Sequence, residues 1–308
     1  MNIALVLAAG RGERMGYDIP KQFIEIREKP VLIYTLESLQ AHPCVDAILC
    51  VCLKGWENRL SGLAKAYGIE KLKWITEGGS TSQESIRNGV YFLEDKCTAE
   101  DMIIVHDGIR PLVEPDILTD VVRVCEEHGN AVTSLPYNEQ IFVVDSEQPE
   151  TTISYIPRET LRRVSTPQAY RFGLIDEAYH EAYEKEIGIY GSAYTNTMMV
   201  ELGHRLFFAS GSDRNIKLTT PGDLEIFEAM LPEEEDTDDD KPRFKCPCCG
   251  MTTLTERLEW EICPVCRWED DTDENAVGGL DIPSGANHEL TLSEARANYR
   301  EFGNIEKI

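Results

Sequence analysis

The sequence is poor in basic residues and has no long apolar segment. Lysine and arginine number 30 against 55 acidic residues, which gives a formal net charge of −25. A general nucleic-acid binder needs a basic face that displaces counterions from phosphates, so this composition argues against one. No apolar run approaches the roughly 20 residues that span a bilayer, and the N-terminus has neither a basic leader nor an A-x-A-like cleavage site. We therefore expect a cytoplasmic protein that binds neither nucleic acid nor a membrane.

An acidic run divides the chain of 308 residues into two parts. Seven of the eight residues 233–240 are Asp or Glu. Such a run repels itself and has no apolar side chain to bury. We interpret residues 232–242 as a linker between a large domain, residues 1–231, and a small cysteine-rich domain, residues 243–308.

The large domain alternates short apolar runs with segments of helical spacing. Residues 3–7 and 47–53 are continuous apolar runs, as expected of strands that are buried on both faces. The rhythm predicts an α/β fold with a doubly wound, mostly parallel sheet, and in such sheets ligands bind beyond the carboxyl ends of the strands. Residues 137–166 break the rhythm with β-type residues on both sides of a polar turn. We predict that they form a protruding β-hairpin arm that packs on a second subunit.

Polar or glycine-rich segments follow several of the predicted strands. The sequence AAGRGERMG at residues 8–16 comes directly after the first strand, where glycines let the backbone approach phosphate oxygens. It matches neither the G-x-G-x-x-G nor the Walker-type pattern. The fourth predicted strand ends near Asp107, whose hard oxygen atoms suit Mg²⁺, and Arg110 follows closely. Residues 215–219 are predicted to form a strand that carries Lys217.

Five segments in order, AAGRGERMG, PKQF, VHDGIRPLV, STPQAY and NIKLTTPGDL, resemble the CTP-dependent cytidylyltransferases that act on sugar-alcohol phosphates. The most similar types are the 2-C-methyl-D-erythritol 4-phosphate and ribitol-5-phosphate enzymes. The resemblance covers residues 1–231. It implies a Rossmann-like α/β nucleotidyltransferase that transfers CMP from CTP to a polyol phosphate with release of pyrophosphate, and a homodimer that forms through the arm.

The resemblance also implies roles for individual residues. Lys21, Lys217 and Arg14 would be the catalytic cations, and Asp107 would hold the Mg²⁺ that bridges the CTP phosphates. The implied nucleotide contacts are Ala8, Ala9, Gly10, Gly12, Gly79, Ser80, Ser85, Asp107 and Arg110. The implied acceptor contacts are Arg158 from the arm of the neighbouring subunit, Thr195 and Thr219. These residue types suit a reaction between two anions, which needs positioning and charge neutralisation more than a general base.

The sequence departs from the family pattern mainly in its acceptor half. Ser82 stands where the glycine-rich loop usually has an arginine, and Thr195-Asn196-Thr197 stands where a Thr-Asp-(Asp/Glu) stretch contributes to the polyol site. We expect 2-C-methyl-D-erythritol 4-phosphate, an isoprenoid precursor, as the acceptor. The alternative is ribitol 5-phosphate or another polyol phosphate of surface-glycan synthesis. A second alternative is a nucleotide-binding scaffold with altered catalysis.

Five of the ten cysteines lie between positions 246 and 266. Cys246 with Cys249, and Cys263 with Cys266, form two C-x₂-C pairs, and four thiolates can close a structural Zn²⁺ site. Iron of the rubredoxin kind and disulfide or redox chemistry are the alternatives. Residues 243–306 resemble the small cysteine-rich CPCC domain of bacteria, and we predict a zinc-ribbon-like domain that can dock a protein partner. The other five cysteines are expected to be small buried apolar residues.

Overall fold

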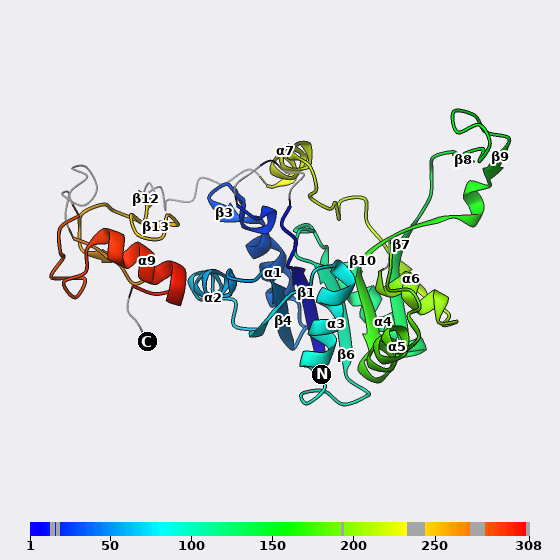
Figure 1. The fold of residues 1–308 in the computed structure, drawn as a ribbon, viewed down its shortest axis with the longest axis horizontal. Coiled ribbons are helices and arrows are strands. Elements are labelled where there is room, and N and C mark those ends of the chain that lie inside the picture. The colour runs from blue at the N-terminus through cyan, green and yellow to red at the C-terminus, as the bar shows by residue number, and fades with distance from the viewer. Residues whose placement is uncertain (13–15, 17–18, 192–193, 233–243, 272–280, 306–308) are drawn as a thin grey trace.

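The computed structural model describes residues 1–12, 16, 19–191, 194–232, 244–271 and 281–305. A large α/β domain is built on a seven-stranded sheet. The small cysteine-rich domain lies at one end of the molecule, and an arm projects at the other (Figure 1). Within the described residues, no helix is long and apolar enough to cross a membrane.

The central sheet has the strand order β11-β7-β10-β6-β1-β4-β5. Its strands are β1 (Asn2–Ala8), β4 (Ala47–Cys52), β5 (Leu72–Glu77), β6 (Met102–Asp107), β7 (Asn130–Pro136), β10 (Arg162–Arg171) and β11 (Phe208–Ser210). Strand β10 is antiparallel to β6 and β7, whereas the other neighbouring strands of the sheet are parallel. The prediction of a mostly parallel α/β sheet is therefore confirmed.

Helices cover both faces of this sheet. One layer consists of α1 (Val31–Ala41), α2 (Glu57–Ala66) and α4 (Pro115–His128). The other consists of α3 (Ser82–Phe92), α5 (Phe172–Lys185) and α6 (Thr195–Glu201). Because side chains alternate along a strand, Ala4 and Val6 of β1 pack into the first layer and Ile3 and Leu5 into the second. This double burial explains why the strand is a continuous apolar run.

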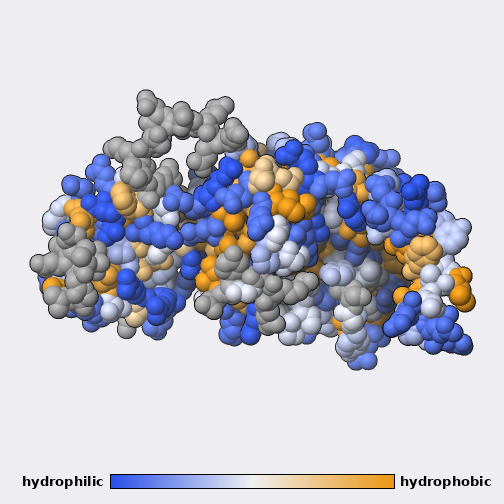
Figure 2. Space-filling model, turned by 90° about the horizontal axis from the view of Figure 1, so that it is seen from above, coloured by the Kyte–Doolittle hydropathy of each residue, from blue (hydrophilic) through white to orange (hydrophobic). Residues whose placement is uncertain are grey.

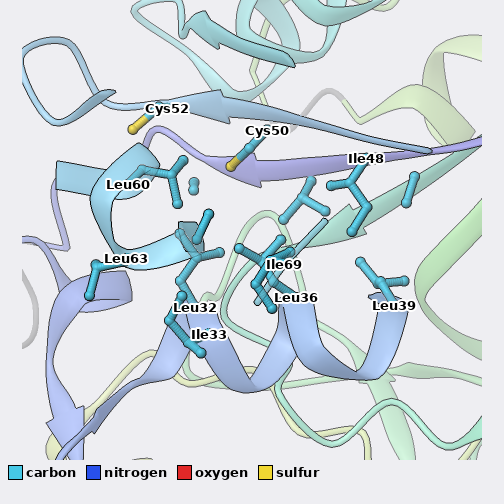
Figure 3. Packing of buried hydrophobic residues seen from close by; sticks show 14 of the residues in the cluster. Leu32, Ile33, Leu36, Leu39, Ile48, Cys50, Cys52, Leu60, Leu63 and Ile69 are labelled. Carbon is cyan, nitrogen blue, oxygen red and sulfur yellow. The ribbon is translucent and has the colours of Figure 1, made fainter. Parts of the chain in front are cut away.

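Figure 3 shows the first layer, in which Ile48, Cys50 and Cys52 of β4 face the leucines of α1 and α2. Cys50 and Cys52 are fully buried, and Cys125 of α4 is buried in the same layer. Burial raises the pKa of the Cys52 thiol to about 12, so the side chain stays protonated and packs as an apolar group. Three of the five scattered cysteines are thus buried as predicted, whereas Cys44 and Cys97 are half-buried.

The arm is shorter than predicted. It consists of β8 (Ile141–Val143), β9 (Ser154–Ile156) and the 3₁₀ turn η3 (Arg158–Thr160). Residues from Arg162 onward return to the central sheet as β10, where they pair with both β6 and β7. The alternating β-type pattern is common to arm and sheet strands, so it could not show where the arm ends.

The strand predicted at residues 215–219 does not form. This segment is extended loop, held by a hydrogen bond from Leu218 N to Ile109 O of 3.0 Å. Helix α7 (Pro221–Met230) follows it as expected, with a capping box between Thr220 and Asp223. Leu218 of this alternating segment is buried in one apolar cluster with Leu224 and Phe227 of α7, so it fills a core position without pairing in the sheet.

Short elements complete the two domains. The segment between β1 and α1 contains the 3₁₀ turn η2 (Lys21–Phe23) and the two-residue strands β2 (Glu25–Ile26) and β3 (Lys29–Pro30). The small domain contains the hairpins β12 (Phe244–Lys245) with β13 (Thr252–Leu254) and β14 (Glu261–Ile262) with β15 (Glu269–Asp270), followed by α9 (Leu292–Phe302). Residues 233–243, which include almost all of the predicted linker, lie outside the described residues.

Candidate active site

A cavity of about 790 Å³ opens at the carboxyl ends of β1, β4 and β5. This is where ligands bind in open α/β sheets. Eight of the predicted site residues line it, namely Ala9, Gly10, Gly12, Lys21, Gly79, Ser80, Ser85 and Thr219. The fold therefore brings together residues that lie far apart in the chain.

The first wall of the cavity is the loop after β1. Gln22 fixes its start, because the Gln22 side-chain amide donates to the carbonyl oxygen of Ala8 at 2.6 Å, and both residues are buried. Gly12 has a φ of +74°, and a Cβ atom there would lie 2.8 Å from Cγ of Lys21. A glycine is therefore required for the Lys21 side chain to lie across the loop. Arg14, predicted to be a catalytic cation, lies outside the described residues.

The second wall is the turn that leads from β5 into α3. A Cβ atom on Gly78 would lie 2.2 Å from Cβ of Ala9, so only glycine lets the two walls approach this closely. Ser85 Oγ accepts from the backbone amide of Gly79 at 3.0 Å. Glu84 accepts from Ser80 Oγ and Ser80 N at 2.5 and 2.7 Å, and these bonds lower the pKa of its carboxyl. Thr81 and Ser82, at the N-terminus of α3, line the cavity. The partial positive charge of this helix end therefore borders it.

The cavity is cationic although the chain as a whole is strongly acidic. Among the residues that the structure describes, its charged lining residues are Arg11, Lys21 and Lys54 against a single acid, Glu77. Such a local excess of positive charge favours an anionic ligand. Sequence reasoning did not assign Lys54 or Glu77 to the site. The signal that could have found them is their position, because Glu77 ends β5 and Lys54 lies two residues after the end of β4, and both strands have their carboxyl ends at this edge of the sheet.

A second charged cluster lies at the end of β6, the neighbour of β1. Lys217 Nζ is 3.1 Å from Asp107 Oδ1, and Arg110 Nε is 3.0 Å from Asp107 Oδ2. Burial would raise the pKa of Asp107, but the two cations outweigh burial and hold that pKa below its usual range. The structure thus brings Asp107, Arg110 and Lys217 together in a fixed, ionised arrangement.

His106 is a buried neighbour of this cluster and contacts the backbone of Arg110. It is fully buried, and burial lowers its pKa to about 4, so the imidazole is neutral at pH 7. Its Nε2 atom lies 3.2 Å from the carbonyl oxygen of Arg110. Arg110 Nη1 in turn donates to the carbonyl oxygen of Asn215 at 2.7 Å, and this bond ties the loop that carries Lys217 to the end of β6.

The predicted acceptor residues do not gather at the cavity within one chain. Thr195 is 1% exposed and its hydroxyl is 2.8 Å from Tyr179 Oη, so it packs in the core and does not line the cavity. Arg158 lies on the arm, exposed, with Nη1 3.5 Å from the carbonyl oxygen of Asn138. Thr219 does line the cavity, and its hydroxyl donates to Asp223 at 2.9 Å. Geometry therefore gives no support to Thr195 as an acceptor contact.

The four predicted metal ligands of the small domain converge. The Sγ atoms of Cys246, Cys249, Cys263 and Cys266 all lie within 4.8 Å of one another. Cys246 to Cys266 and Cys249 to Cys263 are each 3.6 Å apart. A tetrahedral Zn²⁺ with Zn–S bonds of about 2.3 Å separates its sulfur atoms by roughly 3.8 Å, so the arrangement fits this ion. Cys248 is buried but does not belong to the cluster.

Comparison with known proteins identifies both domains. Residues 2–233 match the family model described as 2-C-methyl-D-erythritol 4-phosphate cytidylyltransferase. The chain belongs to this family. Residues 244–308 match the model described as cysteine-rich CPCC. The chain is thus a nucleotidyltransferase of the cytidylyltransferase class joined to a cysteine-rich domain.

Individual relatives support the family and differ in their substrates. The chain is 56% identical over 235 residues to the ribitol-5-phosphate cytidylyltransferase of Lacticaseibacillus paracasei, an alignment that covers 76% of this chain and 100% of that protein. It is 33% identical over 235 residues to the 2-C-methyl-D-erythritol 4-phosphate cytidylyltransferase of Clostridium tetani, with 75% and 90% covered. The crystal structure of 2-C-methyl-D-erythritol 4-phosphate cytidylyltransferase from Thermus thermophilus superposes with a TM-score of 0.57 at 25% identity, with 75% and 98% covered.

Proposed function

We propose that this enzyme transfers CMP from CTP to ribitol 5-phosphate and releases pyrophosphate. The observation that carries the acceptor is the 56% identity to a ribitol-5-phosphate cytidylyltransferase along that protein's whole length. Identity to the Clostridium tetani relative named for the methylerythritol substrate is only 33%. Because of this difference in identity, ribitol 5-phosphate replaces the isoprenoid precursor that we expected as the acceptor. That expectation rested on motifs that the ribitol and methylerythritol enzymes share.

The cavity supplies what the chemistry needs. A phosphate oxygen of the acceptor forms a bond to the α-phosphorus of CTP, while the bond to the bridging oxygen breaks and pyrophosphate leaves with that electron pair. Both reactants are anions, so the main obstacles are their mutual repulsion and their alignment. Arg11, Lys21 and Lys54 line the cavity, and their fixed charges would offset this repulsion.

Asp107 is proposed to hold Mg²⁺ for this reaction. Its carboxyl is ionised at neutral pH because its pKa is lowered by Lys217 and Arg110 against the effect of burial. An ionised carboxylate has about four lone-pair positions, and Lys217, Arg110 and Thr166 engage three of them. The remaining position suits one bond to a hard cation. Mg²⁺ would neutralise the phosphate oxygens of CTP when bound.

We also propose that the enzyme is a homodimer formed through the arm. Ile153 is 88% exposed and Tyr155 is 63% exposed, and such side chains on a two-stranded hairpin favour burial against a partner. Apolar residues are visible in Figure 2 at the end of the molecule where the arm projects. Arg158, on the same arm, would reach the acceptor phosphate of the other subunit. Sedimentation velocity tests this: the wild type should be a dimer and the Ile153→Lys, Tyr155→Lys variant a monomer with little activity, whereas a fully active monomer would refute it.

The acceptor is tested by measuring pyrophosphate release with CTP and separate polyol phosphates. We expect ribitol 5-phosphate to give a higher kcat/KM than 2-C-methyl-D-erythritol 4-phosphate, and the Lys21→Met variant to lose this activity. A preference for the methylerythritol substrate would overturn the proposed acceptor. CTP binding without turnover of any polyol phosphate would instead favour the nucleotide-binding scaffold.

Four further predictions belong to this proposal. The ion in the cysteine cluster is Zn²⁺. The boundaries at residues 1–231, 232–242 and 243–308 remain predictions, as does the cytoplasmic location. A protein partner for the small domain also remains a prediction.

A further inference from the structure

The cysteine-rich domain docks on helix α2 of the transferase domain (Figure 1). A Cβ atom on Gly62 would lie 3.1 Å from Cγ1 of Val265, and one on Gly303 would lie 2.7 Å from Cβ of Asn58. The Asn58 side-chain amide donates to the carbonyl oxygen of Glu301 at 3.1 Å. Leu60 and Leu63 of α2 belong to one continuous apolar cluster with the cysteines of the small domain. The contact is thus close and apolar, as in a domain core.

Arg59 of α2 extends from this contact toward the active site. Its Nη2 atom lies 3.9 Å from Sδ of Met251 in the small domain. Its guanidinium carbon lies 5.1 Å from the ring centre of Trp56 and 6.0 Å from that of Phe23, and the two rings stack with centres 4.7 Å apart. Its Nε atom is buried and has no hydrogen-bond partner within the described structure. Stacking on aromatic faces is therefore its principal interaction on this side.

Both aromatic residues belong to segments that line the nucleotide cavity. Phe23 is fully buried and ends the η2 turn, whose first residue is Lys21. The backbone amide of Trp56 donates to the carbonyl oxygen of Leu53 at 3.0 Å, and Leu53 lines the cavity next to Lys54. A shift of the aromatic pair would consequently move two cavity walls and the cations on them.

We propose that the cysteine-rich domain braces the nucleotide cavity, with Arg59 as the positioning residue that links Met251 to the Phe23 and Trp56 rings. This inference rests on the proposed function, since it assigns the small domain a role in CTP binding by the same enzyme. The Lacticaseibacillus paracasei relative aligns over its whole length with 76% of this chain, so the brace is an addition to a transferase domain that relatives have alone. The cysteine-rich domain should therefore change the affinity for CTP and should not itself supply the activity.

The test disturbs the contact between the two domains while the full chain is kept. Gly62→Arg places a bulky side chain against Val265 and should push the two domains apart. Arg59→Ala removes the contact between Arg59 and Met251 without adding a bulky group. Ser61→Arg is the matched control, because it adds the same side chain one position along α2, where the residue is half-buried beside a different surface depression. We expect Gly62→Arg and Arg59→Ala to raise the KM for CTP by roughly 3- to 30-fold with little change in kcat, and Ser61→Arg to behave as wild type.

Hydrogen exchange gives a readout that does not depend on turnover. In Gly62→Arg, and in wild type stripped of metal by a chelator, peptides covering residues 19–24 and 53–66 should lose protection together. Loss of protection in 57–66 alone, with the KM for CTP unchanged, would overturn the brace. Unchanged protection in all these peptides, in both the variant and the stripped protein, would overturn it too.

Failure of the proposed brace can be told apart from failure of the proposed function. CTP affinity is measured by calorimetry without an acceptor, so a wrong acceptor leaves this test intact. A wild type that binds CTP but turns over no polyol phosphate refutes the proposed function, whereas equal CTP affinity in wild type and Arg59→Ala refutes the brace.

Discussion

Lys217 Nζ lies 3.1 Å from Asp107 Oδ1, although 110 positions separate the two residues in the chain. The contact joins a loop before α7 to the end of β6. It keeps a partly buried carboxylate ionised, because burial by itself would raise the pKa of Asp107. Lys217 therefore keeps Asp107 ionised and also supplies a positive charge of its own.

Replacing this lysine should damage catalysis more than folding. We expect Lys217→Met to lower kcat/KM by about 10²- to 10³-fold, as for other preorganised electrostatic contacts, because Asp107 then loses one of its two ion-pair partners in the described part of the chain and keeps Arg110. Pyrophosphate release under steady-state conditions measures the loss. Lys185→Met is the control, since Lys185 pairs with Glu181 on the exposed face of α5. Near-normal turnover in Lys217→Met would contradict the role.

Lys54 should contribute to CTP affinity. It lines the cavity and pairs with Glu77 at 3.0 Å, but its side chain is 78% exposed, so its charge is screened. We expect Lys54→Ala to raise the KM for CTP by about two- to fivefold, with the effect shrinking as salt is added. Lys73→Ala, a change at an exposed residue near the amino end of β5 and away from the cavity, should leave the KM unaltered. An unchanged KM in Lys54→Ala at low salt would exclude the contact.

His106 should make the fold less stable in mild acid. Its folded pKa of about 4 lies below its ordinary value of 6.5, so below pH 6.5 the unfolded chain binds a proton that the folded chain does not. The free energy of unfolding should then fall as the pH decreases from about 6.5 to 4, with a slope of up to about 1.4 kcal/mol per pH unit from this group.

The measurement compares wild type with His106→Gln. Nuclear magnetic resonance should show one imidazole, missing from the variant, that does not titrate above pH 5. Urea unfolding at several pH values should show a smaller slope in the variant. An imidazole at position 106 that titrates near pH 6.5 would contradict the prediction.

Two neighbouring cysteines of the small domain should differ sharply in their effect on metal content. Cys249 belongs to the four-sulfur cluster, whereas Cys248 is buried outside it. We expect Cys249→Ser to lose the bound Zn²⁺ and to become sensitive to proteolysis in the small domain, because metal binding supplies folding free energy there. Cys248→Ser should keep one Zn²⁺ per chain, as measured by plasma mass spectrometry. Equal zinc content in the two variants would show that the ligand set is wrong.

Local sequence patterns were sufficient for part of this architecture. The glycines after β1 and β5 border the cavity as expected, because a tight turn at a strand end depends on neighbouring residues. The end of the arm and the strand at residues 215–219 were predicted wrongly, since pairing partners decide whether an alternating or apolar segment joins a sheet. Thr195 was assigned to the acceptor site by its place in a motif, whereas packing against Tyr179 buries its hydroxyl.

The amino-acid sequence by itself indicated the reaction class, through five segments that resemble a known family, and the four-cysteine cluster, because the spacing within each C-x₂-C pair fixes which thiols can converge. Only the tertiary structure decided which cations meet Asp107, and that Arg59 joins the small domain to Phe23 beside the cavity at the strand ends. These contacts link residues that are distant in the chain. They exist because burial of apolar surface brings the two domains and the strand ends together, and no local pattern encodes that arrangement.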